Sequence, residues 1–313
     1  MSLEGFFKRP ASTPMSQGEL PIGVNLVDFS QIVISTINAT YTVNDEITED
    51  LVRHCVINTL RSNVLKRKRT HPHVILCIDN GKGGYWRKKL RSYYKFKRAQ
   101  GRDASGWDWE AIFAAMAKIR EELVLNFPYP VLNIEGVEAD DHIGVMTKYF
   151  AKRGVPVCIT SSDGDFTQLQ KFPKVKQWSP LQRKWVKPKH GTPNQDILFK
   201  CFKGDKKDGI APMKAPSDHY TKTDGSRAPS MKAEELHMLM SCKESELPDV
   251  LTPDMLERYN ENRELLDFEF IPEDIQDKII TQYKEYVPAP KKNIYPYFVK
   301  NRLVKLMNVV SDF

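Results

Sequence analysis

The sequence predicts an α/β protein in which helices flank a central, mostly parallel sheet. Three short apolar segments begin as strands and deliver aspartates at their ends: residues 24–28 (VNLVD), 73–79 (HVILCID) and 157–169 (VCITSSDGDFTQL). Segments with helical spacing of apolar residues separate them. Strands that alternate with helices are typical of parallel sheets, and ligands collect at the carboxyl ends of such strands.

The remaining elements follow from the same patterns. Helices are predicted at residues 29–40, 46–68, 107–126, 136–154 and 194–203, a strand at 129–134, and a hairpin at 175–186. Residues 215–229 are polar and rich in Pro and Ser, which predicts an exposed loop, and from 232 onward the chain is mostly helical. A boundary near 190 separates a sheet region, 21–190, from a helical region, 191–313, although one core shared by both regions is equally compatible with the pattern.

Composition and charge limit the class of protein. The chain has 313 residues, of which 41% are hydrophobic, enough for one large domain or two modest ones. A net charge of +7 and a pI of about 9.0 favour a polyanionic partner, a weak signal when taken alone. Five scattered cysteines without a CxxC motif indicate a reducing, intracellular compartment. No apolar run is long enough for a bilayer and the N-terminus carries no secretory signal, so no membrane partner is expected.

Residues 82–102 differ sharply from the rest of the chain. They contain nine Lys or Arg and no acid, interleaved with five aromatic residues. A charge run is ordinarily a solvated surface. Because basic side chains contact phosphates and aromatic side chains stack on unpaired bases, this mixture favours contact with nucleic acid.

Nine acidic residues lie where strands end, where a helix begins, or on a later turn. They are Asp28, Asp79, Glu138, Asp140, Asp141, Asp163, Asp165, Asp205 and Asp208. A helix dipole or a capped turn, with Asp165 as N-cap, would account for one or two of them. So many carboxylates in one pocket cannot stay ionised without cations. Oxygen ligands with no His or Cys favour Mg²⁺ or Mn²⁺ over zinc, and two such ions are a standard arrangement for phosphodiester hydrolysis.

Several short motifs together resemble the 5′-nuclease, or flap endonuclease, family. They are VDFSQ, LCIDN, YWR followed by YYK, EADDHI, SSDGDFTQL, VKQWSP and KGDKKD. The resemblance implies a PIN-like fold, a helical arch at 81–106, and a helix-turn-helix near 200–215 that grips duplex DNA. It also implies 5′→3′ exonuclease and flap endonuclease activity on RNA–DNA and DNA–DNA duplexes, used in removing primers from lagging-strand fragments.

The resemblance also assigns roles to residues. It places Asp28, Asp79, Asp140 and Asp163 around a first metal ion, places Asp165, Asp205 and Asp208 around a second, and makes Glu138 and Asp141 supporting residues. Arg87 and Lys95 would hold the scissile phosphate. The nucleic-acid contacts would include Lys82, Tyr85, Arg87, Lys88, Lys89, Arg91, Tyr94, Lys95, Lys97 and Arg98 on the arch, and Lys203, Gly204, Lys206, Lys207 and Gly209 on the turn. K⁺ binding at this turn is left open, because the usual repeated glycines are missing.

The first 20 residues predict a flexible tail with a candidate partner motif. Leu3, Phe6 and Phe7 form an apolar cluster followed by a Pro- and Ser-rich tether. The cluster is similar to peptides that replication proteins insert into a sliding clamp; the alternative is a strap on the protein's own surface. The family resemblance adds a single-stranded-DNA-binding protein as a partner of the C-terminal region, a monomeric state, and the cytoplasm of an infected bacterial host.

Two other functions remain open from the sequence. One is a PIN-type endoribonuclease with the same chemistry. The other is a structure-specific DNA-binding protein that has lost catalysis, which the complete set of acids disfavours.

Overall fold

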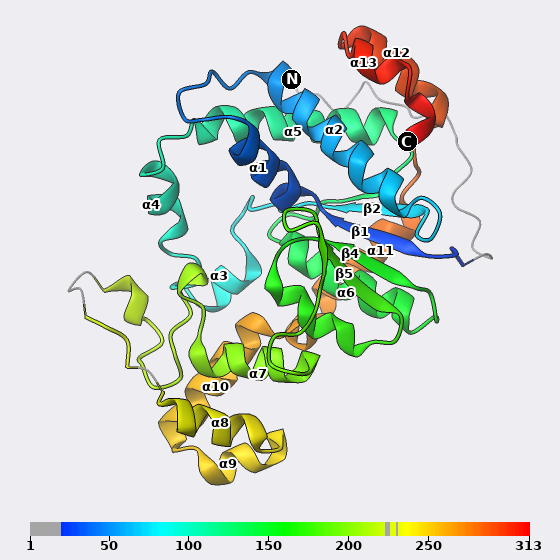
Figure 1. Cartoon of the computed structure of the whole chain (residues 1–313). Coiled ribbons are helices and arrows are strands. Elements are labelled where there is room, and N and C mark those ends of the chain that lie inside the picture. The colour runs from blue at the N-terminus through cyan, green and yellow to red at the C-terminus, as the bar shows by residue number, and fades with distance from the viewer. Residues whose placement is uncertain (1–19, 223–225, 230) are drawn as a thin grey trace.

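The computed structural model describes residues 20–222, 226–229 and 231–313, and its layers agree with the α/β prediction (Figure 1). Among these residues a six-stranded sheet has the strand order β3-β2-β1-β4-β5-β6. Its strands are β1 (Val24–Asp28), β2 (His73–Cys77), β3 (Val131–Leu132), β4 (Val157–Thr160), β5 (Val175–Ser179) and β6 (Lys184–Val186). Strand β6 pairs antiparallel with β5, as expected for the hairpin, and the other neighbours pair in parallel.

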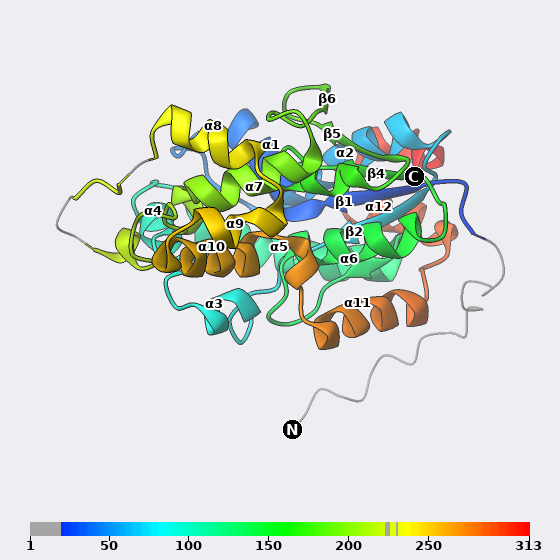
Figure 2. The same ribbon diagram turned by 90° about the horizontal axis from the view of Figure 1, so that it is seen from below.

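Two helical layers enclose the sheet. The helices of the two layers are α1 (Phe29–Thr40), α2 (Glu49–Arg67), α5 (Trp109–Asn126), α6 (Ala139–Ala151), α11 (Glu273–Glu285), α12 (Ile294–Lys300) and α13 (Val304–Met307). Figure 1 shows α1, α2 and α5 above the strands and α6 below them, and Figure 2 looks onto the side with α6 and α11. Helices α1, α2 and α5 share one apolar core with the C-terminal helices α12 and α13. Helices α6 and α11 form the core of the opposite face.

A third apolar core lies beyond the carboxyl ends of the strands. Its helices are α7 (Pro193–Lys203), α8 (Ala233–Ser241), α9 (Leu247–Val250) and α10 (Pro253–Leu266). Tyr93 and Tyr94 from the arch, residues 81–106, also belong to this core. The arch itself contains two short helices, α3 (Trp86–Leu90) and α4 (Arg98–Asp103). The arch is therefore packed on the helical region through Tyr93 and Tyr94.

Two local expectations need correction. The predicted strand at 129–134 is only Val131–Leu132, because these residues pair with β2 alone. The segment after β4 is the 3₁₀-helix η1 (Gly164–Lys171), and its N-cap is Asp163, not Asp165. Within 200–215, α7 is followed by a single 3₁₀ turn, η2 (Lys206–Asp208), and the next α-helix in the described chain begins at Ala233. The helix-turn-helix expected near 200–215 therefore stays a prediction, for which α7 and this turn provide the first helix and the turn.

Candidate active site

The parallel register places the strand-end acids at one edge of the sheet. Asp28, the last residue of β1, is the partner of Cys77 in β2, and its neighbour Val27 is the partner of Thr160 in β4. Asp79 and Asp163 follow these two strand ends within three residues. The edge expected from the sequence is thus present.

Asp28 is fixed by two neighbours. It is the N-cap of α1, where the Gln31 backbone N–H donates to its Oδ1 at 3.2 Å. The Ser161 hydroxyl, which follows β4, donates to its Oδ2 at 2.8 Å. The carboxylate therefore joins the ends of β1 and β4.

The start of α6 is tied to the end of β2 by backbone and side chain. The backbone N–H of Asn80 donates to the carbonyl of Val137 at 3.0 Å. The Ala139 N–H, in the first turn of α6, donates to Asp79 Oδ1 at 2.9 Å. These bonds bring Asp140, the next residue of α6, to the same edge.

Asp163 is held by the turn after β4. Its side chain accepts a bond from the Asp165 N–H at 3.1 Å, and Gln177 Nε2 on β5 donates to its backbone carbonyl at 2.6 Å. Ser161 and Gln177 were not among the residues singled out from the sequence. A lone Ser or Gln carries no signal there, since its role depends on the neighbouring strand.

The first group of acids consists of Asp28, Asp79, Asp140 and Asp163, and burial and like charge act together on Asp28 and Asp140. The pKa of Asp163 is lowered instead, because the effect of burial is outweighed by Lys207 and Lys200. Burial raises the pKa of Asp28 to about 7, and the charges of Asp79 and Asp163 add to this effect. Burial, followed by Asp28 and Asp163, holds the pKa of Asp140 well above its usual range. Carboxylates that raise one another's pKa in a buried pocket favour a bound cation. This all-oxygen donor set fits a hard divalent ion.

A second group of acids forms beside the first. Oxygens of Asp165, Asp205 and Asp208 lie within 4.8 Å of one another. Lys200 on α7 pairs with both Asp165 and Asp205, and Arg98 on the arch pairs with Asp208. Burial raises the pKa of Asp165 against the opposing charge of Lys200, whereas for Asp205 burial is outweighed by Lys200 and the pKa is lowered. Lys200 is a further site residue that the sequence pattern did not reveal.

Glu138 and Asp141 are held by cations of the protein itself. The Arg87 guanidinium lies 2.8 Å from Glu138 Oε2 and 2.8 Å from Asp141 Oδ1, and Lys95 also pairs with Glu138. Trp86 Nε1 donates to Asp141 Oδ2 at 2.9 Å. Burial alone would raise the pKa of Glu138, but Lys95 and Arg87 lower it to about 2. These contacts join the arch to the start of α6.

Three arch residues that were expected to face a substrate instead contact other parts of the protein. The Arg87 side chain is 3% exposed, and its Nε donates to the Leu265 carbonyl at 2.8 Å. Tyr94 is buried and its hydroxyl donates to Glu138, so its ring does not offer a stacking surface. Arg91 is half-buried and pairs with Glu264 at 3.0 Å. The sequence could not separate them from their exposed neighbours, because the acids that they meet lie far along the chain.

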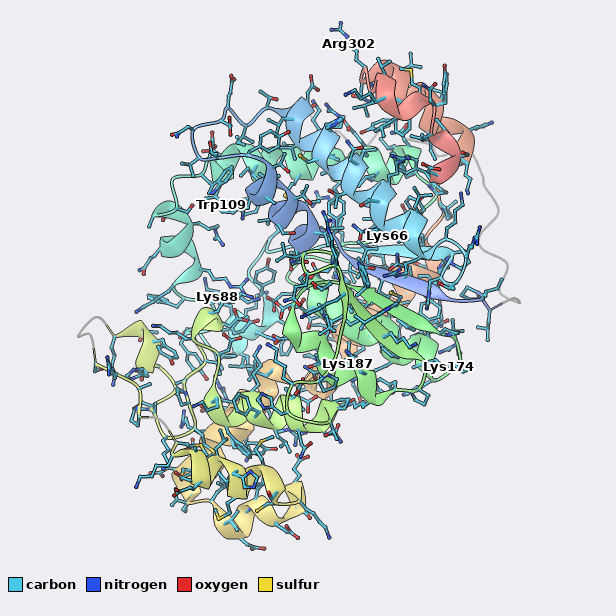
Figure 3. All side chains as sticks on the ribbon, in the orientation of Figure 1. Lys66, Lys88, Trp109, Lys174, Lys187 and Arg302 are labelled. Atoms are coloured by element: carbon cyan, nitrogen blue, oxygen red, sulfur yellow. The ribbon has the colours of Figure 1, made fainter. Side chains whose placement is uncertain are left out.

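The other basic residues of the arch and turn remain accessible. Exposed ones are Lys82, Lys88, Lys89, Lys97, Lys206 and Lys207, and half-buried ones are Lys95, Arg98 and Lys203. The aromatic Tyr85 is also half-buried. Lys207 pairs with Asp163 at 3.3 Å. Figure 3 labels Lys88 on α3 of the arch and Trp109 at the start of α5, just after the arch. A basic rim thus borders the acidic groups.

The turn after α7 is joined tightly to the arch. The Lys95 N–H donates to the Asp208 carbonyl at 2.7 Å. Gly204 and Gly209 both have positive φ, 70° and 75°. A Cβ on Gly209 would lie 2.7 Å from the Tyr93 carbonyl, and one on Gly204 would lie 2.4 Å from the Ile210 carbonyl. Only glycine allows these backbones to approach so closely.

Two predictions concern parts that the site does not include. Leu3, Phe6 and Phe7 lie outside the described residues. Within the described chain, none of the helices combines the length and apolar character needed to cross a membrane.

Two family models together match residues 28–313. The model of the 5′-3′ exonuclease N-terminal resolvase-like domain matches residues 28–193, and that of the T4 RNase H C-terminal region matches residues 191–313. The chain is 43% identical over 293 residues to ribonuclease H of Enterobacteria phage T4, covering 93% of this chain and 96% of that protein. It is 28% identical to a 5′-3′ exonuclease of Buchnera aphidicola, over 47% of this chain and 50% of that protein.

Solved structures share the fold. The T5 D15 flap endonuclease, in a pseudo-enzyme-product complex with DNA and metal ions, has a TM-score of 0.59 at 17% identity, covering 84% of this chain and 98% of that one. The T5 D15 protein crystallised with metal ions has a TM-score of 0.53, covering 85% of this chain and 99% of that one.

Proposed function

Since the chain belongs to the 5′-3′ exonuclease family, and is therefore a nuclease, we propose that it cleaves RNA–DNA and DNA–DNA duplexes from their 5′ ends and at 5′ flaps. The observation that carries this proposal is the first group of acids, in which Asp28 is buried and Asp79, Asp140 and Asp163 are half-buried. Asp28 and Asp140 have raised pKa values because burial and neighbouring carboxylates disfavour their charge. Such a costly arrangement is explained by a bound cation and serves no evident purpose in a protein that only binds nucleic acid.

Two divalent ions, Mg²⁺ or in its place Mn²⁺, fit the two groups of acids. Asp28, Asp79, Asp140 and Asp163 would hold one, and Asp165, Asp205 and Asp208 the other. When bound, such ions supply an activated water and stabilise the charge that develops on the phosphate. The turn after α7 is a further candidate site, where backbone carbonyls would bind K⁺.

The residues of the chain orient the substrate. The exposed lysines of the arch and turn would contact phosphates, which fixes the duplex beside the acids without reading its sequence. Lys95 remains the best candidate for the reacting phosphate, because its side chain is 12% exposed and borders Glu138, whereas Arg87 is enclosed. Glu138 and Asp141 keep this part of the arch in position.

The biological role that this activity supports is the removal of RNA primers from lagging-strand fragments, in the cytoplasm of an infected bacterial host. A sliding clamp would bind the N-terminal motif at Leu3, Phe6 and Phe7, and a single-stranded-DNA-binding protein the C-terminal region. We expect the nuclease itself to act as a monomer. Deleting residues 1–8 should abolish stimulation by the clamp and leave the melting temperature and unstimulated cleavage unchanged.

One assay separates the proposed function from its rivals. A 5′-labelled RNA primer on a DNA template is incubated with Mg²⁺ or with EDTA, beside the same RNA alone. Stepwise release from the 5′ end of the duplex with Mg²⁺ supports the proposal. Cleavage within the free RNA would indicate a PIN-type endoribonuclease, and binding without any product a catalytically inactive protein.

A further inference from the structure

Lys200 lies between two carboxylates of the second group of acids. Its ammonium pairs with Asp165 and lies 2.8 Å from Asp205 Oδ2. The three side chains are 24%, 18% and 16% exposed, respectively, so water screens these pairs only in part. Two of the three carboxylates that gather within 4.8 Å are therefore already matched by a positive charge of the protein.

The two groups of acids differ in this respect. Arg98 pairs with Asp208, so every member of the second group has a basic partner. In the described part of the chain, no Lys or Arg forms an ion pair with Asp28, Asp79 or Asp140. In the first group Asp163 pairs with Lys207 at 3.3 Å. Asp28, Asp79 and Asp140 thus depend on a cation from outside, whereas every acid of the second group has a basic partner from the protein.

We propose that Lys200 is a built-in counter-ion of the second group, holding Asp165 and Asp205 together in the ion-free protein and competing with the divalent ion there. The inference rests on the proposed function in taking these acids as ion ligands. An ammonium and a divalent ion that share two carboxylates cannot both keep full contact with them, because the like charges repel. Each divalent ion that enters the second group therefore displaces Lys200.

The displaced ammonium has a natural new partner. Lys200 lies on α7, the helix that leads directly into the basic turn with Lys206 and Lys207. A phosphate of a bound nucleic acid offers the negative charge that Lys200 loses when it leaves the carboxylates. Nucleic acid and the second ion should therefore bind more tightly together than separately, and the coupling is reciprocal.

Calorimetric titration of Mn²⁺ into the full-length protein tests the proposal. Asp79→Asn identifies the binding event of the first group, because it weakens that event. In Lys200→Gln the second event should tighten by about tenfold, since the competing charge is gone. Lys200→Arg keeps the charge and should keep an affinity near that of the original protein. Lys187→Gln, at an exposed lysine labelled in Figure 3 that pairs with none of these acids, removes the same charge and should change neither event.

Two further measurements test the stability of the ion-free protein and the coupling between nucleic acid and the second ion. In the ion-free protein Lys200→Gln should lower the melting temperature, and Mn²⁺ should raise it by more than in the original protein. A nuclease-resistant duplex should tighten the second ion in the original protein and do so less in Lys200→Gln.

The outcomes separate this proposal from the proposed function. Equal or weaker Mn²⁺ affinity in Lys200→Gln would overturn the role of Lys200 alone. The absence of a second binding event in both proteins would overturn it together with the two-ion function.

Discussion

At the scale of single residues, Asp28 combines a cost in stability with a role in function. Its pKa is raised from 3.8 to about 7, so in the ion-free protein the group takes up a proton on folding. A group whose folded pKa lies above its unfolded value contributes less to stability as the pH rises between these two values. The free energy of unfolding should therefore contain a part that falls from about pH 4 to about pH 7.

Asp28→Asn tests this trade-off. The amide keeps the N-cap of α1 and removes the buried charge, so the ion-free protein at pH 8 should be stabilised by about 1–4 kcal/mol. Cleavage should fall by at least about 10²–10³, because charge stabilisation at the reacting phosphate is lost. Thermal melting and single-turnover cleavage check the two halves. A variant that melts lower at pH 8 than the original protein would contradict the electrostatic account.

Arg87 carries the opposite expectation. Arg87→Ala leaves Glu138 and Asp141 without their shared cation in a buried place, which should destabilise the protein by about 3–5 kcal/mol. Its exposed neighbour provides the control, since Lys88→Ala should leave the melting temperature unchanged. If Arg87→Ala melts normally yet slows cleavage of bound substrate, the guanidinium acts on the phosphate after all.

The acids of the site could be predicted from the sequence, whereas the partners and the burial of the basic side chains could not. Strand-end aspartates appear in the sequence as apolar runs that stop at Asp, so Asp28, Asp79 and Asp163 stand out. Lys200 and Ser161 carry no such mark, because their partners come from other elements. For the same reason Arg87 and Lys88 look alike in the sequence, although one is buried and the other exposed.

At the scale of elements, the alternation of strands and helices was enough to predict the parallel sheet and its acidic edge. The arch was harder, since its position depends on distant contacts such as the Lys95 N–H with the Asp208 carbonyl. The helix-turn-helix expected near 200–215 stays a prediction, since α7 is followed by a turn with a positive-φ glycine at 209 and the next α-helix of the described chain begins at Ala233. Local patterns thus predicted the elements, and long-range pairs decided their roles.

The arch also supports a prediction about binding. Lys88→Ala, Lys89→Ala and Lys97→Ala each remove an exposed charge that forms no ion pair with an acid of the described chain. Each variant that removes a phosphate contact should reduce the slope of log affinity against log salt by about 0.9, with little change in cleavage of bound substrate. Binding to a 5′-flap duplex at several salt concentrations measures the slope. Three variants with unchanged slopes would mean that the duplex does not cross this face.

At the scale of the whole molecule, the two sequence regions do not fold around separate cores. Phe268, Ile275 and Ile279 from the C-terminal region lie in the core on one face of the sheet, and Phe298 and Phe313 in the core on the other. Gly144 on α6 leaves room for Phe268, since a Cβ there would lie 3.2 Å from that ring. The shared core that the sequence left open is thus present, and the boundary near 190 marks a change of composition.

This arrangement leads to a prediction about truncation. A fragment of residues 21–190 keeps all six strands and most acids, but it loses α11, α12 and α13 and leaves apolar surface exposed on both faces of the sheet. We expect it to be poorly folded, because each large side chain withdrawn from a core forfeits about 1.5–3 kcal/mol. Circular dichroism and hydrogen exchange should show loss of protection in the central strands, and co-expression with residues 191–313 should restore it. The milder deletion of residues 304–313, which removes Leu306 and Phe313 far from the acids, should lower the melting temperature while leaving cleavage at low temperature intact. A fragment 21–190 with native protection would show instead that the sheet region is a domain in its own right.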